Sequence, residues 1–145
     1  MEKHFRKLEK MYHSAPVQKL YPGIHIDISE GYAQITLPVN PAYFHAGGAV
    51  HGSIYFRLLD DAAYFAVNSV IFDAFMLTTS FHSELLRPVT KGLLIAKGRI
   101  IHRSNKLIVA ESELWDDRNK KIALGKGTFM KSTTALNQIS GYENT

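Results

Sequence analysis

The stretch from His51 to about Val70 constrains the fold most, because its helical pattern has apolar side chains around nearly the whole circumference. The apolar positions are Ile54, Tyr55, Phe56, Leu58, Leu59, Ala62, Ala63, Phe65, Ala66 and Val67. A helix that is apolar on all sides is buried. The simplest way to bury it is to wrap a curved sheet around it. The C-terminal end stays open, since residues 70–72 either close the helix or belong to the turn beyond it.

The rest of the chain supplies the strands for such a sheet. Residues 24–39 alternate apolar and polar on both sides of Gly31, which predicts a β-hairpin. Four further strand-like stretches follow the central helix, separated by short turns. They cover residues 75–86, 93–102, 107–115 and 122–131. Short turns favour antiparallel neighbours, so the fold class is α+β with an antiparallel sheet.

Both ends of the chain lie outside this pattern. Phe5, Leu8, Met11 and Tyr12 recur at helical spacing, and Ser14-Ala15-Pro16 ends that helix. The helix is interpreted as a docking helix, with a membrane-surface helix as the alternative. Residues 133–145 are polar. We therefore divide the chain into an N-terminal helical extension (1–16), a main domain (17–132) and a polar C-terminal tail (133–145).

Composition narrows the function classes. A length of 145 residues predicts one main domain, and the absence of cysteine excludes thiol nucleophiles and cysteine-ligated metal sites. The net charge of +4 suggests an anionic partner, which could be nucleic acid, a membrane surface or a phosphorylated cofactor. No secretory h-region and no uninterrupted apolar span is present, so we expect a soluble cytoplasmic protein without a membrane partner.

A polar stripe on the central helix needs an explanation. At about 100° per residue, its members fall within one sector about 100° wide. They are Arg57, Asp60, Asp61, Tyr64 and Asn68. Arg57 and Asp61 are spaced i,i+4 and can form a salt bridge, which leaves Asp60 unexplained. Asp60 is then either a catalytic or ligand-binding carboxylate, or part of an inter-subunit ion pair or loop cap.

The loop before this helix is rich in glycine and histidine. Glycine lets a ligand approach the backbone, and a helix N-terminus offers unpaired N–H groups at the positive end of the dipole. Gly52 therefore suits a carbonyl oxygen that gains negative charge, although a tight loop that binds nothing has the same sequence. The loop matches neither phosphate-binding glycine motif. His45 and His51 lack metal-ligand spacing, so no metal site is expected.

The segment His51-Gly52-Ser53-Ile54-Tyr55-Phe56-Arg57-Leu58-Leu59-Asp60-Asp61 resembles the H-G-G-x(6)-D signature of hotdog-fold acyl-CoA thioesterases of the phenylacetate-degradation type. The order of elements is similar as well, over roughly residues 17–131. The resemblance implies a hotdog fold, in which an antiparallel sheet wraps around the long helix. It implies that the backbone N–H of Gly52 polarises the thioester carbonyl. It also implies that Asp60 acts as nucleophile or as general base for water, with Asp61 as the fallback.

The same resemblance points to residues around these two. It implies a hydroxyl at Thr78, with Thr79 adjacent, contributed by the partner subunit of a homodimer or of a dimer-of-dimers tetramer. The chain departs from the family pattern at Ser53, which replaces a glycine, and at His45, which replaces an Asn or Gln. The predicted substrate-binding residues are His51, Ser53, Tyr64, Asn68, Thr79, Arg87, Arg103 and Lys106.

The positive charge fits the phosphates of coenzyme A, which is part of the substrate, so no separate cofactor is expected. Basic residues at or near strand ends are candidates to hold the phosphates. They are Arg87, Lys91, Arg103, Lys106, Lys126 and Lys131. Nucleic-acid binding is disfavoured because no known motif is present. Two alternatives to hydrolysis stay open: a hotdog hydratase or dehydratase that uses His45, His51 or His82, and a non-catalytic acyl-CoA-binding module.

Overall fold

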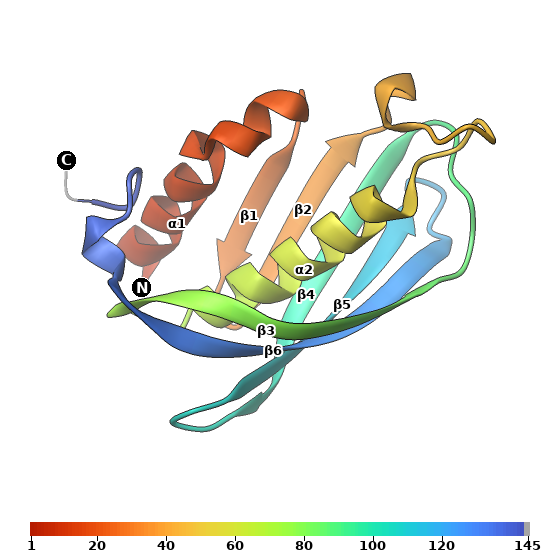
Figure 1. The fold of residues 1–145 in the computed structure, drawn as a ribbon. Coiled ribbons are helices and arrows are strands. Elements are labelled where there is room, and N and C mark those ends of the chain that lie inside the picture. Colours follow the sequence, from red (N-terminus) through yellow and green to blue (C-terminus); the bar gives the residue numbers. More distant parts are fainter. Residues whose placement is uncertain (144–145) are drawn as a thin grey trace.

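Helix α2 (Gly52–Asn68) lies against the concave face of a six-stranded antiparallel sheet, in the computed structural model that describes residues 1–143 (Figure 1). The strand order is β1-β2-β4-β5-β6-β3. The strands are β1 (His25–Ser29), β2 (Tyr32–Pro38), β3 (Ala74–Leu85), β4 (Leu93–Arg103), β5 (Ile108–Asp116) and β6 (Lys121–Ala135). Three short 3-10 helices span Pro16–Leu20, Pro41–Tyr43 and Leu136–Gln138. The predicted α+β sheet around a central helix is confirmed.

The central helix is buried as its pattern predicts. Leu58, Leu59 and Ala62 are inaccessible to solvent. Gly98 on β4 permits the close contact, because a Cβ there would lie 2.2 Å from the carbonyl oxygen of Ala62. Phe56 is an exception to the all-round burial, with 42% of its surface exposed. It faces outward beside β3, where its ring meets that of Phe81 edge-on at 5.5 Å.

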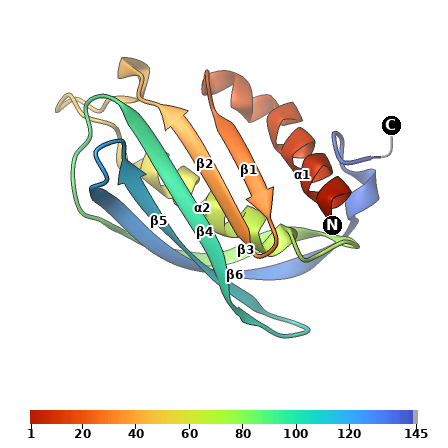
Figure 2. The ribbon, with the colours of Figure 1, turned by 180° about the vertical axis from the view of Figure 1, so that it is seen from behind.

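Helix α1 (Glu2–Ser14) packs beside β1, on the same side of the sheet as α2 (Figures 1 and 2). Its buried residues are His4, Phe5, Leu8, Met11 and Tyr12, which include all four apolar positions predicted. The docking interpretation of this helix is confirmed. One edge of the sheet, β1, is thereby flanked by a helix. The other edge is β3, a twelve-residue strand whose only partner strand within residues 1–143 is β6.

The C-terminal residues pack more closely than their polarity suggests. Strand β6 continues to Ala135, four residues beyond the predicted end at Lys131. Leu136 is inaccessible, and Tyr142 is 93% buried with its hydroxyl 2.7 Å from Nδ1 of His4. Leu136, Ile139 and Tyr142 are three apolar residues in a short polar segment, too few to establish a helical or strand period, so the sequence could not predict this packing. The division into extension, domain and tail stays a prediction. No helix within residues 1–143 is long and apolar enough to cross a membrane.

Candidate active site

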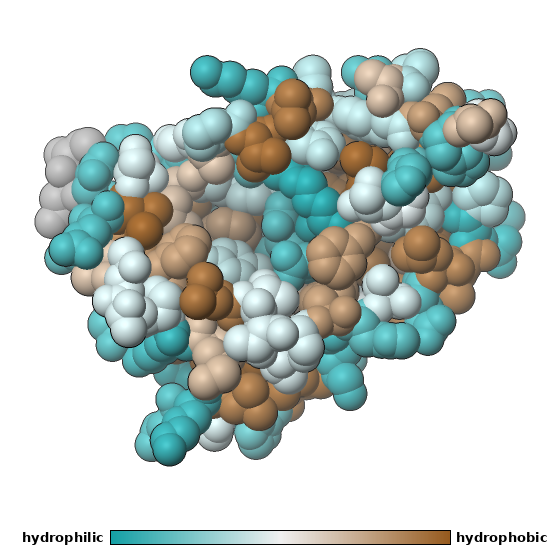
Figure 3. All heavy atoms as spheres, viewed as in Figure 1, coloured by the Kyte–Doolittle hydropathy of each residue, from teal (hydrophilic) through white to brown (hydrophobic). Residues whose placement is uncertain are grey.

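A cavity of about 630 Å³ opens between α1, α2 and β3. Figure 3 shows the hollow near the middle of this face, with hydrophilic atoms inside it and apolar residues along parts of its rim. Its lining comes from α1 and the following turn (Met11, Tyr12, Ser14, Ala15, Pro16, Val17, Gln18), α2 (Arg57, Asp60, Asp61, Tyr64, Phe65), β3 (Phe75, Met76, Leu77, Thr78) and the C-terminal segment (Ile139, Ser140). Four of the five residues of the polar stripe therefore face one cavity.

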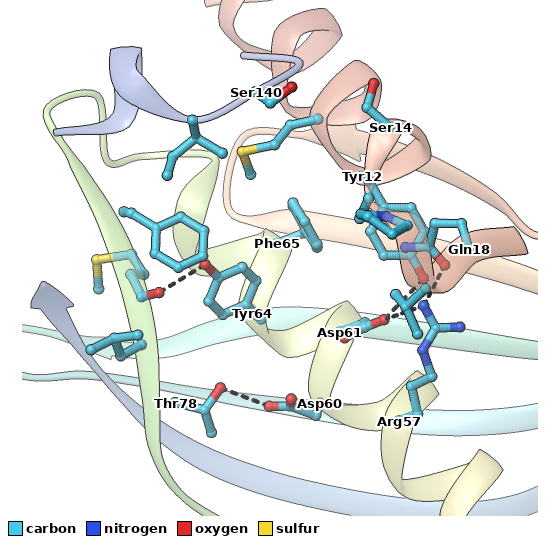
Figure 4. Close-up of a pocket in the computed structure, with 18 residues that line it drawn as sticks. Tyr12, Ser14, Gln18, Arg57, Asp60, Asp61, Tyr64, Phe65, Thr78 and Ser140 are labelled. Carbon is cyan, nitrogen blue, oxygen red and sulfur yellow. Dashed lines mark hydrogen bonds and ion pairs between the residues drawn. The ribbon is translucent and has the colours of Figure 1, made fainter. Parts of the chain in front are cut away.

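Asp60 presents its carboxylate to this cavity with a single hydrogen-bond partner among residues 1–143. Thr78 on β3 donates its hydroxyl hydrogen to Oδ1 of Asp60 at 2.9 Å (Figure 4). Burial raises the pKa of Asp60 above its usual value, and the hydrogen bond from Thr78 opposes that shift. The resemblance implied a threonine from a partner subunit, whereas here Thr78 of the same chain makes the contact, because β3 borders α2 within one chain. A carboxylate held in this way can accept a proton or attack a carbonyl.

Asp61, one residue along, has different surroundings. Its Oδ2 accepts a hydrogen bond from the Tyr12 hydroxyl at 2.9 Å and lies 3.6 Å from Nη2 of Arg57. Nη2 of Arg57 also donates to the side chain of Gln18, and the guanidinium lies 4.1 Å from the ring centre of Tyr21. Burial raises the pKa of Asp61 to about 6, with Arg57 and Tyr12 acting against that shift. The predicted Arg57–Asp61 salt bridge is confirmed, and it leaves Asp60 as the less engaged carboxylate.

Replacing Tyr12 with Phe tests this network through stability. The hydroxyl of Tyr12 favours the charged form of Asp61, so its contribution is present above a pH of about 6 and is lost as Asp61 becomes protonated. We expect Tyr12→Phe to lower the free energy of unfolding by about 1–2 kcal/mol at pH 8 and by less at pH 5. Urea unfolding of both proteins at the two pH values measures the difference. Equal losses at both would show that the hydroxyl does not act through the charge of Asp61.

The N-terminus of α2 faces a different hollow. A depression of about 290 Å³ is lined by His45, Val50, Gly52, Tyr55 and the segment Leu85–Pro88. The backbone N–H of Gly52 has no hydrogen-bond acceptor among residues 1–143, as expected for the first residue of a helix. The N–H that is predicted to polarise the thioester carbonyl is therefore unpaired, and its residue, Gly52, lines a surface hollow.

The two histidines near the start of α2 have defined tautomers when neutral, and of the two His45 lines this hollow. Nδ1 of His51 caps α2 by accepting from the Ser53 N–H at 3.0 Å. Nδ1 of His45 accepts from the Gly47 N–H at 2.9 Å. The ring proton of neutral His45 is therefore on Nε2, where it can be donated to a ligand.

Gly52 and Asp60 cannot serve one small reacting group within a single chain. They are eight residues apart on one helix, which corresponds to about 12 Å along its axis. They also open to different hollows, Asp60 to the larger cavity and Gly52 to the smaller one. A polarising N–H and a base must both lie within about 3 Å of the reacting carbonyl or its water. Within one copy of the chain, the two groups therefore lie at two separate hollows.

The other predicted site residues are dispersed. Tyr64 lines the larger cavity and donates its hydroxyl hydrogen to the Met76 carbonyl at 2.8 Å. Asn68 is fully buried beneath the end of α2 and does not line the cavity. Thr79 bonds to Thr128 on β6 rather than to Asp60. Of these residues, only Tyr64 joins Asp60 in the cavity.

The basic residues that were predicted to bind substrate also lie in different parts of the structure. Arg87 lines the Gly52 hollow, together with a neighbouring one that contains Lys120 and Lys121. Arg103 and Lys106 lie at the turn between β4 and β5, where Arg103 donates to the Val70 carbonyl at 3.3 Å. Only Arg87 is thus adjacent to the unpaired N–H. Within residues 1–143, no three His, Asp or Glu side chains are arranged to hold a metal ion.

The sequence did not point to the α1 side of the cavity. Tyr12 and Gln18 contribute polar contacts there, and Ile139 of the C-terminal segment contributes apolar surface beside them. The amphipathic pattern of α1 showed that it docks, but a docking pattern does not reveal which groups on α2 it meets. Gln18 belongs to no motif or periodic pattern that could have identified it as a site residue.

Comparisons with known proteins agree with this architecture. The structure of the Escherichia coli PaaI protein from the phenylacetic acid degradation operon superposes with a TM-score of 0.83 at 24% identity, covering 92% of this chain and 96% of that one. A thioesterase family protein from Silicibacter pomeroyi gives 0.75 at 25% identity, covering 86% and 96%. The conserved protein PA5202 from Pseudomonas aeruginosa gives 0.74 at 27% identity, covering 81% and 94%. The profile of the thioesterase superfamily matches residues 47–123, more than half of the sequence, and the chain therefore belongs to the thioesterase superfamily with a hotdog fold.

Proposed function

We propose that this protein hydrolyses acyl-CoA thioesters to a free acid and CoA. The observation that carries the proposal is the carboxylate of Asp60, which lines a cavity of about 630 Å³ and has Thr78 as its one hydrogen-bond partner in the described chain. The unpaired N–H of Gly52 adds the second group that thioester hydrolysis needs. Membership of the thioesterase superfamily supports the thioester as the bond cleaved.

The chemistry assigns one task to each group. As a general base, Asp60 takes a proton from water while the water oxygen attacks the thioester carbonyl carbon. The carbonyl oxygen becomes negative and accepts the hydrogen bond from Gly52. The C–S bond then breaks, and the CoA sulfur leaves with the proton that Asp60 returns. As a nucleophile, Asp60 would itself attack, forming an anhydride that water hydrolyses. Label found in Asp60 after a single turnover in ¹⁸O-water would establish the nucleophilic route, because water reaches Asp60 only by attacking its carboxyl carbon in the anhydride.

A site built from two copies follows from the 12 Å separation. Strand β3 is a long sheet edge with exposed apolar neighbours, and such an edge is a liability in a monomer. The exposed apolar residues of β3, the adjoining loop and the neighbouring elements include Phe56, Leu77, Leu85, Leu86, Leu124 and Met130. Antiparallel pairing of two β3 strands would set two α2 helices side by side in opposite directions. Gly52 of one copy would then face Asp60 of the other in a homodimer, or in each half of a dimer-of-dimers tetramer.

Arg87 is the best-supported phosphate-binding residue of those predicted. It borders the hollow that contains Gly52, and no anionic partner occupies its side chain in the described chain. Its guanidinium can form paired hydrogen bonds with a phosphate of CoA.

The test is release of free CoA from a series of acyl-CoA thioesters by the purified protein, followed with a thiol reagent. Hydrolysis of one or more of them supports the proposal. Hydration of an enoyl-CoA without thiol release would instead favour a hydratase, although none of the residues that line the Asp60 cavity is a histidine. Thermal stabilisation by CoA without turnover of any thioester would favour a binding module.

Replacing Thr78 with Val tests the state of Asp60. Asp60 must be ionised to act, and the Thr78 hydroxyl favours the ionised form. Its loss raises the pKa of Asp60 further, so the acid limb of the kcat profile should move to higher pH. At the plateau, kcat should fall about tenfold as the carboxylate loses its positioning contact. Thr133→Val, on the exposed far part of β6, serves as the matched control. An unshifted acid limb would contradict the assigned role.

A further inference from the structure

We propose that the junction of α1 with the C-terminal segment limits the length of the acyl group that the cavity accepts. This inference rests on the proposed function and adds the substrate range of the same site. It assigns a specificity role to Ile139 and Met11, which lie outside the sequence motif and line the cavity from its two terminal elements.

The cavity extends from Asp60 and Thr78 to the junction of α1 with the C-terminal segment. Figure 4 shows Asp60 and Thr78 at one side of it, and Ser14 and Ser140 at the opposite side, with Tyr64 and Phe65 between them. An acyl group whose carbonyl carbon lies at Asp60 therefore has one direction in which to extend. That direction leads toward α1 and the C-terminal segment.

The walls along this direction are apolar and tightly arranged. The rings of Tyr64 and Phe65 meet edge-on at 5.1 Å, and those of Tyr64 and Phe75 at 6.1 Å. The hydroxyl of Tyr64 is occupied by the Met76 carbonyl, so the ring presents carbon surface to the cavity. Each methylene placed against such walls is removed from water, which favours longer acyl groups until the cavity ends.

The far end is a fixed contact rather than an opening. A Cβ on Gly141 would lie 2.8 Å from Cα of Met11, so the C-terminal segment touches the backbone of α1 at this point. Gly141 has a φ of +92°, which a glycine adopts without strain. The segment is anchored beyond this point by Tyr142, whose hydroxyl bonds to His4, and its turn is closed by the Tyr142 N–H and the Ile139 carbonyl.

The α1 wall is held in place as well. Tyr12 bonds to Asp61, and Gln18 bonds to Arg57, so the two ends of the wall segment are each tied to α2. Met11 is 94% buried and leaves little freedom for the wall to move outward. A chain longer than the cavity must therefore displace either a buried helix or an anchored segment. We infer a steep limit on acyl length rather than a gradual one.

The test measures kcat/KM over straight-chain acyl-CoAs from acetyl to palmitoyl for the full-length protein and its variants. Ile139→Ala removes side-chain volume at the far end, so the limit should move to longer chains. The first chain that the wild type rejects should be hydrolysed about tenfold or more faster. Ile139→Phe should move the limit to shorter chains. Acetyl-CoA, which does not reach the junction, should be hydrolysed within about twofold of the wild-type rate by both variants.

Two further variants keep the result interpretable. Leu20→Ala, at a side chain that is 67% exposed and outside the cavity, should leave the profile unchanged. Ile139→Val makes a smaller change in the same direction if Ile139→Ala does not fold. An unchanged limit in Ile139→Phe and in the smaller variant, with hydrolysis intact, would overturn the length limit alone. Absence of hydrolysis of every thioester by the wild type would overturn the proposed function, and the length limit with it.

Discussion

Asp60→Asn is expected to lower kcat/KM for thioester hydrolysis by about a thousandfold, the middle of the range of about 10² to 10⁴ for loss of a general base. Asn has the same shape and can still accept the hydrogen bond from Thr78. Its amide cannot accept a proton from water at neutral pH. Because burial raises the pKa of Asp60, the charged carboxylate costs stability at pH 7. The variant should therefore unfold at the same temperature as the wild type or higher.

The control for this variant is Asp27→Asn on β1, whose side chain is 68% exposed. It removes one carboxylate from a surface remote from the cavity and should keep full activity. Thiol release and thermal unfolding are measured on all three proteins. Full turnover by Asp60→Asn would remove this carboxylate from the mechanism. Asp61, the fallback, would then be the group to test.

Gly52→Pro is expected to lower kcat by about 10² to 10³, the usual cost of losing one donor to a developing oxyanion. Proline removes the backbone N–H and is well tolerated at the first position of a helix. His51, the preceding residue, has φ −63° and ψ 141°, the extended conformation that a residue before proline adopts. The substitution thus removes the N–H donor and adds a ring whose Cβ would meet the exposed Leu85 side chain, with little disturbance of the backbone.

Gly52→Ala is the matched control, because it adds a Cβ and retains the N–H. That Cβ would meet the Cδ1 atom of Leu85 at 2.8 Å, the end of an exposed and flexible side chain that can move away. We expect Gly52→Ala to keep most of its kcat, with KM raised by less than about tenfold. If the Pro and Ala variants lost activity equally, the loss would come from steric change, and the N–H would have no special role.

The fold was predictable because its signals are local. The all-round apolar pattern of α2 and the period-two stretches of the strands each follow from which side chains face the core. The exceptions arise where tertiary packing outweighs pattern. Phe56 has a core residue's chemistry but lies beside the free edge of β3. Leu136 and Tyr142 pack against the body of the protein from a segment without periodicity.

The candidate site was predictable in part. The i,i+4 spacing of Arg57 and Asp61 was enough to predict their ion pair and so to single out Asp60. Asn68 lies in the same angular sector of α2 as the rest of the polar stripe, but one full turn beyond Tyr64. It is buried at the end of the helix, where its side-chain amide donates to the Tyr64 carbonyl. Tyr12 and Gln18 reach the site from a separate helix and turn. Such long-range contacts depend on how elements dock, which spacing along the chain does not encode.

The central claim is that each active site takes Gly52 from one copy and Asp60 from another, and a mixed dimer tests it most directly. Asp60→Asn and Gly52→Pro chains are produced together with different tags, and the heterodimers are isolated. Each heterodimer contains one site with both groups and one with neither, so it should regain about half of the wild-type activity. Heterodimers no more active than the two inactive parents would contradict the shared site.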